Sequence, residues 1–417
     1  MASTNNLKFY IFLAFVAIIL ANVLKSGLFP INNDIKRTLG YPENSLLNFT
    51  ELSGRYGYLS EEHTLVTEDG YILTIFRING KQCAGKLKKP PVVLMHGLLL
   101  SSDLWLDAGP DAGLAYLISD ACYDLWVGNQ RGNYYSRRHV RLNPDKDEEF
   151  WQFSADEIGL YDIPATIDYV LNTTGEEKLN YIGYSQGAGT FLIMCSERPG
   201  YCDKVNILIA LAPATRLTNT KSVLAQSILG GAQQLEGLLA AIGIYEALPK
   251  GALNQELLAF VCKFSATSEF ICGNLIATLD SSHPGSISKE TIKISFGHSP
   301  AGTSVRTLAR YGQALSSDKF QKYDYGKPRN LDIYGEEKPP SYNLSTVTIP
   351  FVTLYGKNDN LVATEDVLWL IKELPNVLEA VEVADPMWNH FDVPYSQFSK
   401  DLIFPKVNEY LQKYSIY

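Results

Sequence analysis

The feature that most constrains the fold is an alternation of short apolar runs and helix-like stretches, which begins near residue 64. Runs of four to eight apolar residues between turn signals are typical of buried strands. Asp69-Gly70, between the first two runs, indicates a hairpin. Strands that alternate with helices predict a mostly parallel sheet with helices on both faces, an α/β fold. The predicted strands lie at residues 64–68, 71–78, 91–95, 124–127, 180–182, 207–211, 351–354 and 378–383.

The alternation stops near residue 215 and resumes near residue 350. The intervening segment is not rich in Pro and Ser, and it carries apolar residues at helical spacing. It therefore predicts an inserted helical cap or lid, residues 215–349, which divides an α/β core into residues 28–214 and 350–417. We interpret the apolar stripe as cap core rather than as a lipid contact; it comprises Leu224, Ile228, Leu235, Leu238 and Ile242.

Residues 1–27 have the pattern of a secretory signal peptide. Lys8 precedes an uncharged apolar run of 16 residues, 9–24, which is shorter than the roughly 20 residues of a membrane span. We expect cleavage between about residues 21 and 27, no stable transmembrane anchor afterwards, and a secreted or lysosomal protein. An uncleaved signal anchor is the alternative.

Entry into the secretory pathway makes glycosylation and disulfides possible. Acceptor triplets begin at Asn48, Asn172 and Asn343. Six cysteines are too few for a disulfide scaffold. We favour one pair, Cys262 with Cys272, because the two enclose a short loop. The others stay open: Cys195 and Cys202 form a weaker pair, and Cys83 and Cys122 are free or buried.

Composition excludes several classes of protein. The 36 Lys and Arg against 45 Asp and Glu give a net charge of −9, which argues against nucleic acid or an anionic membrane as a partner. The apolar fraction of 46% excludes wholesale disorder. No metal-ligand motif, phosphate-binding loop or dinucleotide fingerprint is present, so we expect neither a metal nor a cofactor. The oligomeric state stays open.

The motif Gly183-Tyr184-Ser185-Gln186-Gly187 lies between a predicted strand and a helical pattern. In this context Gly-x-Ser-x-Gly is typical of a nucleophile elbow, a sharp turn that needs small neighbours and projects the serine hydroxyl. The helix N-terminus beneath it favours developing negative charge. Ser185 is therefore the candidate nucleophile.

A serine hydroxyl needs a base, and in elbows of this kind the partners follow in the order serine, acid, histidine. His283 and His298 lie in the predicted cap, whereas His390 follows the last predicted strand and is the candidate base. Asp359 stands just past the strand at 351–354, where catalytic groups gather in open α/β sheets, and is the candidate acid. Glu365 and Asp366 are its rivals, although their place at a helix start suits capping.

An oxyanion hole in such a fold uses the amide after the nucleophile and one from an early loop. This assigns the backbone N–H groups of Gln186 and Leu98, since Leu98 follows the strand at 91–95. Gly97 lets the chain turn close to the substrate. His96 precedes the serine in the chain, so we interpret it as a residue that shapes this loop.

From about Gly57 to its end, the chain resembles the acid lipases, the family of gastric lipase, lysosomal acid lipase and the insect lipases of that type. The resemblance rests on residues 67–73, 96–99, 128–133, 150–154, 161–165, 183–187, 298–304, 358–359 and 389–390. It implies an α/β-hydrolase core with a helical cap and hydrolysis of neutral lipid esters, such as triacylglycerols or cholesteryl esters, at lipid–water interfaces. Ser185, Asp359 and His390 match the family triad, Leu98 and Gln186 the oxyanion positions, and Cys262–Cys272 the cap disulfide.

Three features depart from the family pattern. Tyr184 stands where vertebrate members often carry His, and we expect it to affect specificity rather than the triad. Leu59 replaces a usual proline, far from the catalytic motifs. Residues 217–251 are rich in Ala, Gly and Leu. The substrate chain length and the behaviour at interfaces are therefore the properties that the resemblance predicts least. The alternatives are a carboxylesterase or thioesterase acting on shorter esters, and a non-catalytic lipid-binding or yolk-type protein.

Overall fold

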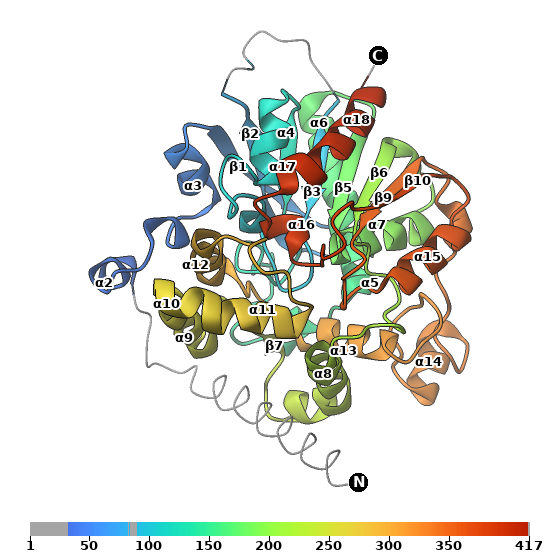
Figure 1. Cartoon of the computed structure of the whole chain (residues 1–417). Helices are drawn as coiled ribbons and strands as arrows, with labels where there is room; N and C mark the ends of the chain where they lie inside the picture. Colours follow the sequence, from blue (N-terminus) through green and yellow to red (C-terminus); the bar gives the residue numbers. More distant parts are fainter. Residues whose placement is uncertain (1–31, 82, 84–89, 416–417) are drawn as a thin grey trace.

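Eight strands form one sheet in the order β1-β2-β4-β3-β5-β6-β9-β10 in the computed structural model, which describes residues 32–81, 83 and 90–415 (Figure 1). The pairs β1–β2 and β2–β4 are antiparallel, and the remaining neighbours are parallel. This confirms the predicted fold class. The strands are β1 (Leu59–Val66), β2 (Ile72–Asn79), β3 (Val92–Met95), β4 (Leu125–Gly128), β5 (Leu179–Tyr184), β6 (Val205–Leu211), β9 (Phe351–Tyr355) and β10 (Val377–Glu382).

Helices cover both faces of the sheet, as the apolar character of the central strands requires. Side chains alternate along β3: Val93 and Met95 join one apolar core, and Val92 and Leu94 join the other. The first core is closed by α6 (Ile163–Thr174), α7 (Gln186–Glu197) and α15 (Thr364–Glu373). The second is closed by α4 (Leu114–Asp120) and α18 (Phe404–Lys413). Shorter helices are α2 (Asn33–Thr38), α3 (Phe49–Arg55), α5 (Ala155–Glu157), α16 (Asp392–Tyr395) and α17 (Ser399–Leu402).

Between β6 and β9 the chain is mainly helical and lies below the sheet in Figure 1. A two-stranded sheet joins β7 (Glu246–Ala247) to β8 (Thr303–Ser304). The helices here are α8 (Val223–Ala241), α9 (Leu253–Cys262), α10 (Ser265–Thr267), the π-helix η6 (Ser268–Gly273), α11 (Asn274–Leu279), α12 (Lys289–His298), α13 (Val305–Ala314) and α14 (Lys327–Tyr334). We call this segment the cap; its limits at 215 and 349 stay a prediction.

The buried face of α8 differs from the predicted stripe. Its buried residues are small or medium in size: Ala225, Leu229, Ala232 and Leu239. Leu238 and Ile242 are 57% and 54% exposed, so their interpretation as cap core was wrong. The physical reason is a close approach of α13, where a Cβ on Gly312 would meet the Leu229 carbonyl oxygen, so that the narrow small-residue face of α8 packs inward.

Three disulfides join Cys83 to Cys122, Cys195 to Cys202 and Cys262 to Cys272. The pairs 262–272 and 195–202 agree with the pairings considered from the sequence. The sequence left the state of Cys83 and Cys122 open, and the structure pairs them. Cys83 follows β2 and Cys122 precedes β4, and the antiparallel pairing of these strands brings the two cysteines together across 39 residues of sequence.

The predicted signal peptide, residues 1–27, lies outside the described residues, so it stays a prediction. Among the residues that the structure does describe, no helix is both long and apolar enough to cross a membrane.

Candidate active site

Ser185 lies at the turn between β5 and α7, with φ 53° and ψ −116°. A positive φ is unfavourable for a residue with a side chain and persists only where the surroundings hold it. Here the Ser185 amide donates to the carbonyl of Leu211 at 2.9 Å, and the Ser185 carbonyl accepts from the amides of Ala188 and Ala214, each at 3.1 Å. The turn is thus fixed from β6 on one side and from α7 on the other.

The two glycines of the motif are required by close backbone contacts. A Cβ on Gly187 would lie 2.6 Å from the carbonyl oxygen of Met95 and 2.7 Å from that of His96. A Cβ on Gly183 would lie 2.6 Å from the amide nitrogen of Ala188. Both distances are shorter than any normal contact, which explains why the elbow needs small neighbours.

The structure brings Ser185, His390 and Asp359 together. His390 Nε2 lies 2.9 Å from Ser185 Oγ, and His390 Nδ1 lies 2.7 Å from Asp359 Oδ2. The carboxylate therefore fixes the tautomer in which Nδ1 carries hydrogen and Nε2 is free to accept the serine proton. All three residues are buried, and Ser185 is only 7% exposed.

Asp359 is held in place by its own loop, and its two rivals from the sequence have other partners. Its Oδ1 accepts from the amides of Leu361 and Val362 at 2.9 and 2.7 Å. The rival Asp366 instead accepts from Arg216 at 2.8 Å and from the Asn219 amide at 2.9 Å. Glu365 pairs with a surface lysine, Lys221. Of these three acids, only Asp359 contacts the imidazole.

A second carboxylate, Asp280, faces the same site from the cap, at the end of α11. Its Oδ2 accepts from the His390 amide and its Oδ1 from the Asn360 amide, both at 2.7 Å. Burial and the nearby Asp359 raise the pKa of Asp280 to about 8. Sequence reasoning missed this residue because a lone aspartate in the cap belongs to no motif.

The electrostatic environment favours protonation of His390. Burial alone lowers the pKa of an imidazole, but the carboxylates of Asp359 and Asp280 outweigh that effect and raise the pKa of His390 above its ordinary value. The site is therefore built to stabilise an imidazolium, the species that forms when the histidine accepts a proton.

The early loop with Gly97 and Leu98 lies against the serine. A Cβ on Gly97 would be 3.1 Å from Ser185 Cβ, so Gly97 and Ser185 lie against each other. The residues that follow them, Leu98 and Gln186, carry the two candidate oxyanion amides. The Gln186 amide begins α7, where the first amides have no acceptor within the helix. The cap braces the loop, since the Ala301 amide donates to the Leu99 carbonyl at 2.7 Å.

His96 supports this loop from below. Its Nδ1 donates to the Gly97 carbonyl at 2.8 Å, and its Nε2 accepts from the Gln130 amide at 3.0 Å. Complete burial lowers its pKa to about 4, so the ring stays neutral in this role. The arrangement agrees with the interpretation of His96 as a loop-shaping residue, and it explains why residues 128–133 accompany the site.

Tyr184 contacts the base rather than only neighbouring the nucleophile. Its hydroxyl donates to the His390 carbonyl at 3.0 Å, and the two rings lie 5.0 Å apart between centroids. The side chain is buried and lies against His390, a contact that the sequence did not predict; its expected effect on specificity stays a prediction.

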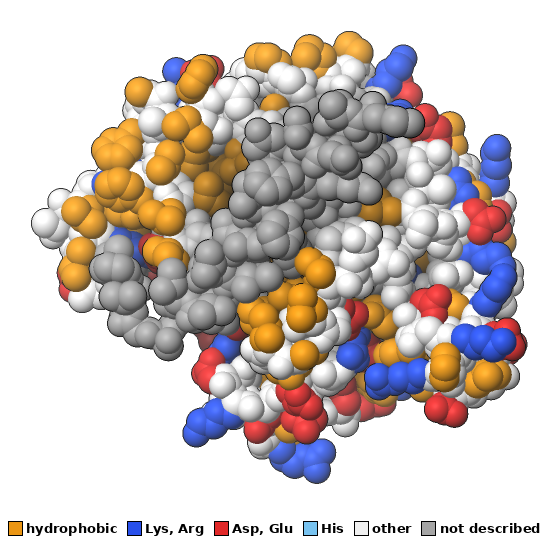
Figure 2. Space-filling model, turned by 90° about the horizontal axis from the view of Figure 1, so that it is seen from below, with side chains coloured by type: hydrophobic (Ala, Val, Ile, Leu, Met, Phe, Trp, Pro, Cys, Tyr) orange, Lys and Arg blue, Asp and Glu red, His pale blue; other side chains and the backbone are white. Residues whose placement is uncertain are grey.

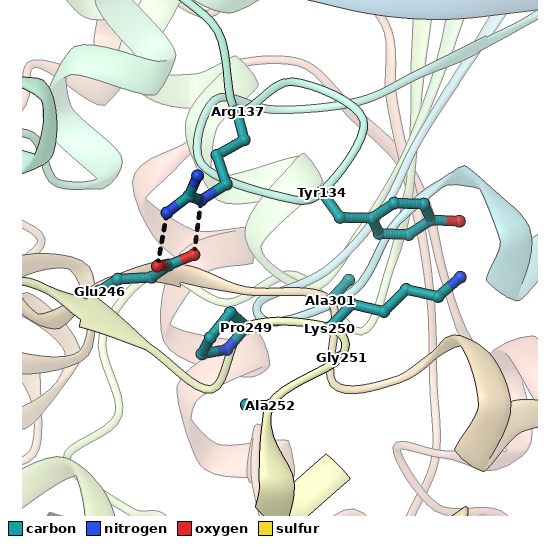
Figure 3. A pocket seen from close by; sticks show the side chains of 8 residues that line it. All are labelled: Tyr134, Arg137, Glu246, Pro249, Lys250, Gly251, Ala252 and Ala301. Carbon is teal, nitrogen blue, oxygen red and sulfur yellow. Dashed lines mark hydrogen bonds and ion pairs between the residues drawn. The ribbon is translucent and has the colours of Figure 1, made fainter. Parts of the chain in front are cut away.

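A pocket of about 240 Å³ lies beside the loop that Ala301 braces (Figure 3). Ser185, Asp359 and His390 do not line it. Its charges are matched: Arg137 pairs with Glu246 at 2.9 Å, and the Lys250 ammonium lies 4.0 Å from Asp103. The pocket thus offers no unpaired charge to a ligand.

The three candidate glycosylation residues, Asn48, Asn172 and Asn343, are all exposed. The side-chain oxygens of Asn48 and Asn343 cap helices by accepting from nearby backbone amides. Glycosylation of these residues stays a prediction.

Comparison with known proteins places this geometry in a class. Residues 90–395 match the family model described as alpha/beta hydrolase fold, and residues 49–109 match a partial alpha/beta-hydrolase lipase region. A solved structure of a hypothetical protein from Pseudomonas aeruginosa has a TM-score of 0.51 at 11% identity, covering 86% of this chain and 94% of that one. The fold and the site thus define an α/β-hydrolase.

Sequence relatives narrow the class. Lipase 1 of Drosophila melanogaster is 36% identical over 89% of this chain and 81% of its own length. Human gastric triacylglycerol lipase is 36% identical over 85% of this chain and 87% of its own. Lysosomal acid lipase/cholesteryl ester hydrolase of Macaca fascicularis is 34% identical over 91% and 94%. The chain belongs to the family of these acid lipases and is a carboxylic ester hydrolase.

Proposed function

We propose that this protein is a serine lipase that hydrolyses ester bonds of neutral lipids, triacylglycerols or cholesteryl esters, through an acyl-enzyme on Ser185. The observation that carries the proposal is the continuous relay from Ser185 Oγ through the imidazole of His390 to Asp359, at 2.9 and 2.7 Å. The names of the relatives supply the substrate class.

In the proposed reaction Ser185 Oγ attacks the ester carbonyl carbon while its proton passes to His390 Nε2. The backbone N–H groups of Leu98 and Gln186 bind the oxyanion that forms. Collapse of the tetrahedral intermediate breaks the bond to the leaving alkoxide, which takes the proton from His390 and departs as the alcohol. Water then attacks the acyl-enzyme by the same route and releases the fatty acid. No cofactor enters these steps.

The surface of the cap supports a lipid–water interface as the working environment. Hydrophobic side chains gather in patches on the face seen from below, over the cap helices (Figure 2). A net charge of −9 gives little attraction to anionic membranes, so we assign binding to apolar contacts. The exposed apolar residues of the cap include Val223, Leu238, Ile242, Leu257, Phe260, Phe264, Phe270 and Ile271.

We further propose that the protein travels the secretory pathway and is secreted or lysosomal. The predicted signal peptide, the three exposed acceptor asparagines and the three disulfides all support this location.

Replacement of the nucleophile tests the proposal. Ser185→Ala removes the attacking oxygen and leaves the fold intact, so turnover of emulsified triolein should fall by about 10⁶-fold. A serine-directed phosphonate should label Ser185 in the wild type and leave the variant unlabelled. Substantial hydrolysis by a pure, folded Ser185→Ala preparation would exclude the mechanism.

An acyl-chain series from acetate to oleate separates the lipase from its alternatives. A preference for acetate without activity on emulsified lipid favours a small-ester carboxylesterase, and a preference for thioesters favours a thioesterase. Lipid binding without turnover in the wild type favours a non-catalytic carrier.

A further inference from the structure

The part of the cap that follows α11 is joined by hydrogen bonds to the two loops that carry Asp359 and His390. Ser281 Oγ donates to the Asn358 carbonyl, and the Asn389 side-chain amide donates to the Ser281 carbonyl at 2.9 Å. The Asn358 side-chain amide donates to the Ser282 carbonyl at 3.2 Å. We call residues 280–282 the clasp, because this short segment spans both loops.

Asp280 is the one member of the clasp whose side chain bonds to both loops at once. Its two oxygens accept from the amides of Asn360 and His390, each at 2.7 Å, and its own carbonyl accepts from the Asn360 side chain at 2.9 Å. Asn360 directly follows Asp359 in the chain, so the carboxylate sets the separation of the acid and base backbones. The Asp280 side chain lies in the buried interior, where the low local dielectric makes a hydrogen bond stronger than at the surface.

We propose that Asp280 is a positioning residue, a cap-borne carboxyl group that holds the backbones of Asp359 and His390 at the spacing that the relay to Ser185 requires. The inference rests on the proposed serine mechanism. It makes the cap part of the catalytic apparatus as well as its cover. His390 is then fixed at three points: its amide by Asp280, its carbonyl by Tyr184 and its Nδ1 by Asp359.

The test compares Asp280→Asn and Asp280→Ala with the wild type and with Asp385→Asn. Asparagine keeps the shape but can accept from only one of the two amides, because its nitrogen is a donor. Alanine accepts from neither. Asp385 is a matched control: its carboxylate lies nearby, 3.3 Å from His283 Nε2, and no hydrogen bond joins it to Asp359 or His390 among the described residues.

Misplacement of a catalytic group by about 1 Å can cost 10²-fold in rate. We expect kcat per folded molecule to fall about tenfold in Asp280→Asn and about 100-fold in Asp280→Ala, with KM unchanged within about twofold. Asp385→Asn should keep the wild-type kcat. Phosphonate labelling of Ser185 should slow by the same factors as kcat, because it uses the same relay.

Three results are distinguishable. If Asp280→Asn keeps wild-type kcat while only its melting temperature falls, Asp280 is structural and the inference is wrong. If Asp280→Ala does not fold, Asp280→Asn decides alone, normalised by circular dichroism for the folded fraction. If the wild type itself neither turns over esters nor reacts with phosphonate, the proposed function fails, whatever the Asp280 variants do.

Discussion

At the residue scale, the choice of acid within the relay can be tested by a single atom change. Asp359→Asn keeps the shape of the side chain but can present an N–H donor to His390 Nδ1 in place of an accepting oxygen. The imidazole is then no longer held in the tautomer that leaves Nε2 free to accept the serine proton. We expect kcat to fall by roughly 10³–10⁴-fold with little change in thermal stability. The measurement is steady-state hydrolysis of a soluble long-chain ester.

The control is Asp366→Asn, which leaves only one accepting oxygen for Arg216 and the Asn219 amide and does not touch the relay. This variant should melt at a lower temperature and keep its kcat. The opposite pattern, activity lost with Asp366 and kept with Asp359, would refute the assignment.

The candidate catalytic residues were predictable to the extent that they belong to ordered motifs. Ser185 stands in a pentapeptide whose glycines have a steric reason, and Asp359 and His390 each follow a recognisable strand. Asp280 and Tyr184 were not predictable as parts of the site. Their contacts with His390 depend on where the cap packs and on what lies beneath the imidazole, which are long-range properties that no local pattern encodes.

At the element scale, the contact between α8 and α13 depends on one glycine. A Cβ on Gly312 would press into the Leu229 carbonyl, which is backbone and cannot move aside cheaply. Gly312→Ala should therefore lower the free energy of unfolding by about 1–3 kcal/mol, the usual range for overpacking. Thermal or urea unfolding measures this effect.

The matched control is Gly237→Ala on α8, where no atom lies within 4 Å of the added methyl group. That variant should be more stable than the wild type by about 0.4–1 kcal/mol, because the unfolded chain loses freedom and the helix gains propensity. Equal effects of the two substitutions would contradict the close approach of the helices.

Most strands were predictable because they carry short apolar runs. β1 (Leu59–Val66) is the exception: it is largely polar, and the strand predicted at 64–68 overlaps it only at residues 64–66. The buried face of α8 was not predictable, because α8 has more apolar residues than α13 can cover. Helical spacing identifies a helix, but the partner decides which side of it is buried, and here the partner selected Ala225, Leu229 and Ala232.

At the scale of the whole molecule, three buried groups with raised pKa values should make stability depend on pH, and together they outweigh His96, whose lowered pKa acts the other way. The pKa of Asp280 is raised to about 8, and carboxylate partners raise the pKa values of His298 and His390, although burial opposes the rise for both histidines. Each group binds its proton more tightly in the native than in the unfolded state. The native state therefore holds more protons between pH 6.5 and 8, and the free energy of unfolding falls as the pH rises through this interval.

We expect the melting temperature, measured by calorimetry at constant ionic strength, to be higher at pH 6.5 than at pH 8. Asp280→Asn removes one of the three groups, so its melting temperature should depend less on pH across the same interval. A wild-type melting temperature that rises toward pH 8 would contradict the assignment of these buried protons.

The order of strands in the sheet also bears on how the chain is made. β9 pairs with β6, yet the entire cap is synthesised between them. Until residues 351–355 leave the ribosome, the apolar strand Val205–Leu211 is an open edge with unpaired peptide groups, the kind of surface that recruits other chains. This edge stays exposed for the time that cap synthesis takes. His390 emerges later still, so the ester-cleaving centre stays inert until residue 390 has been synthesised.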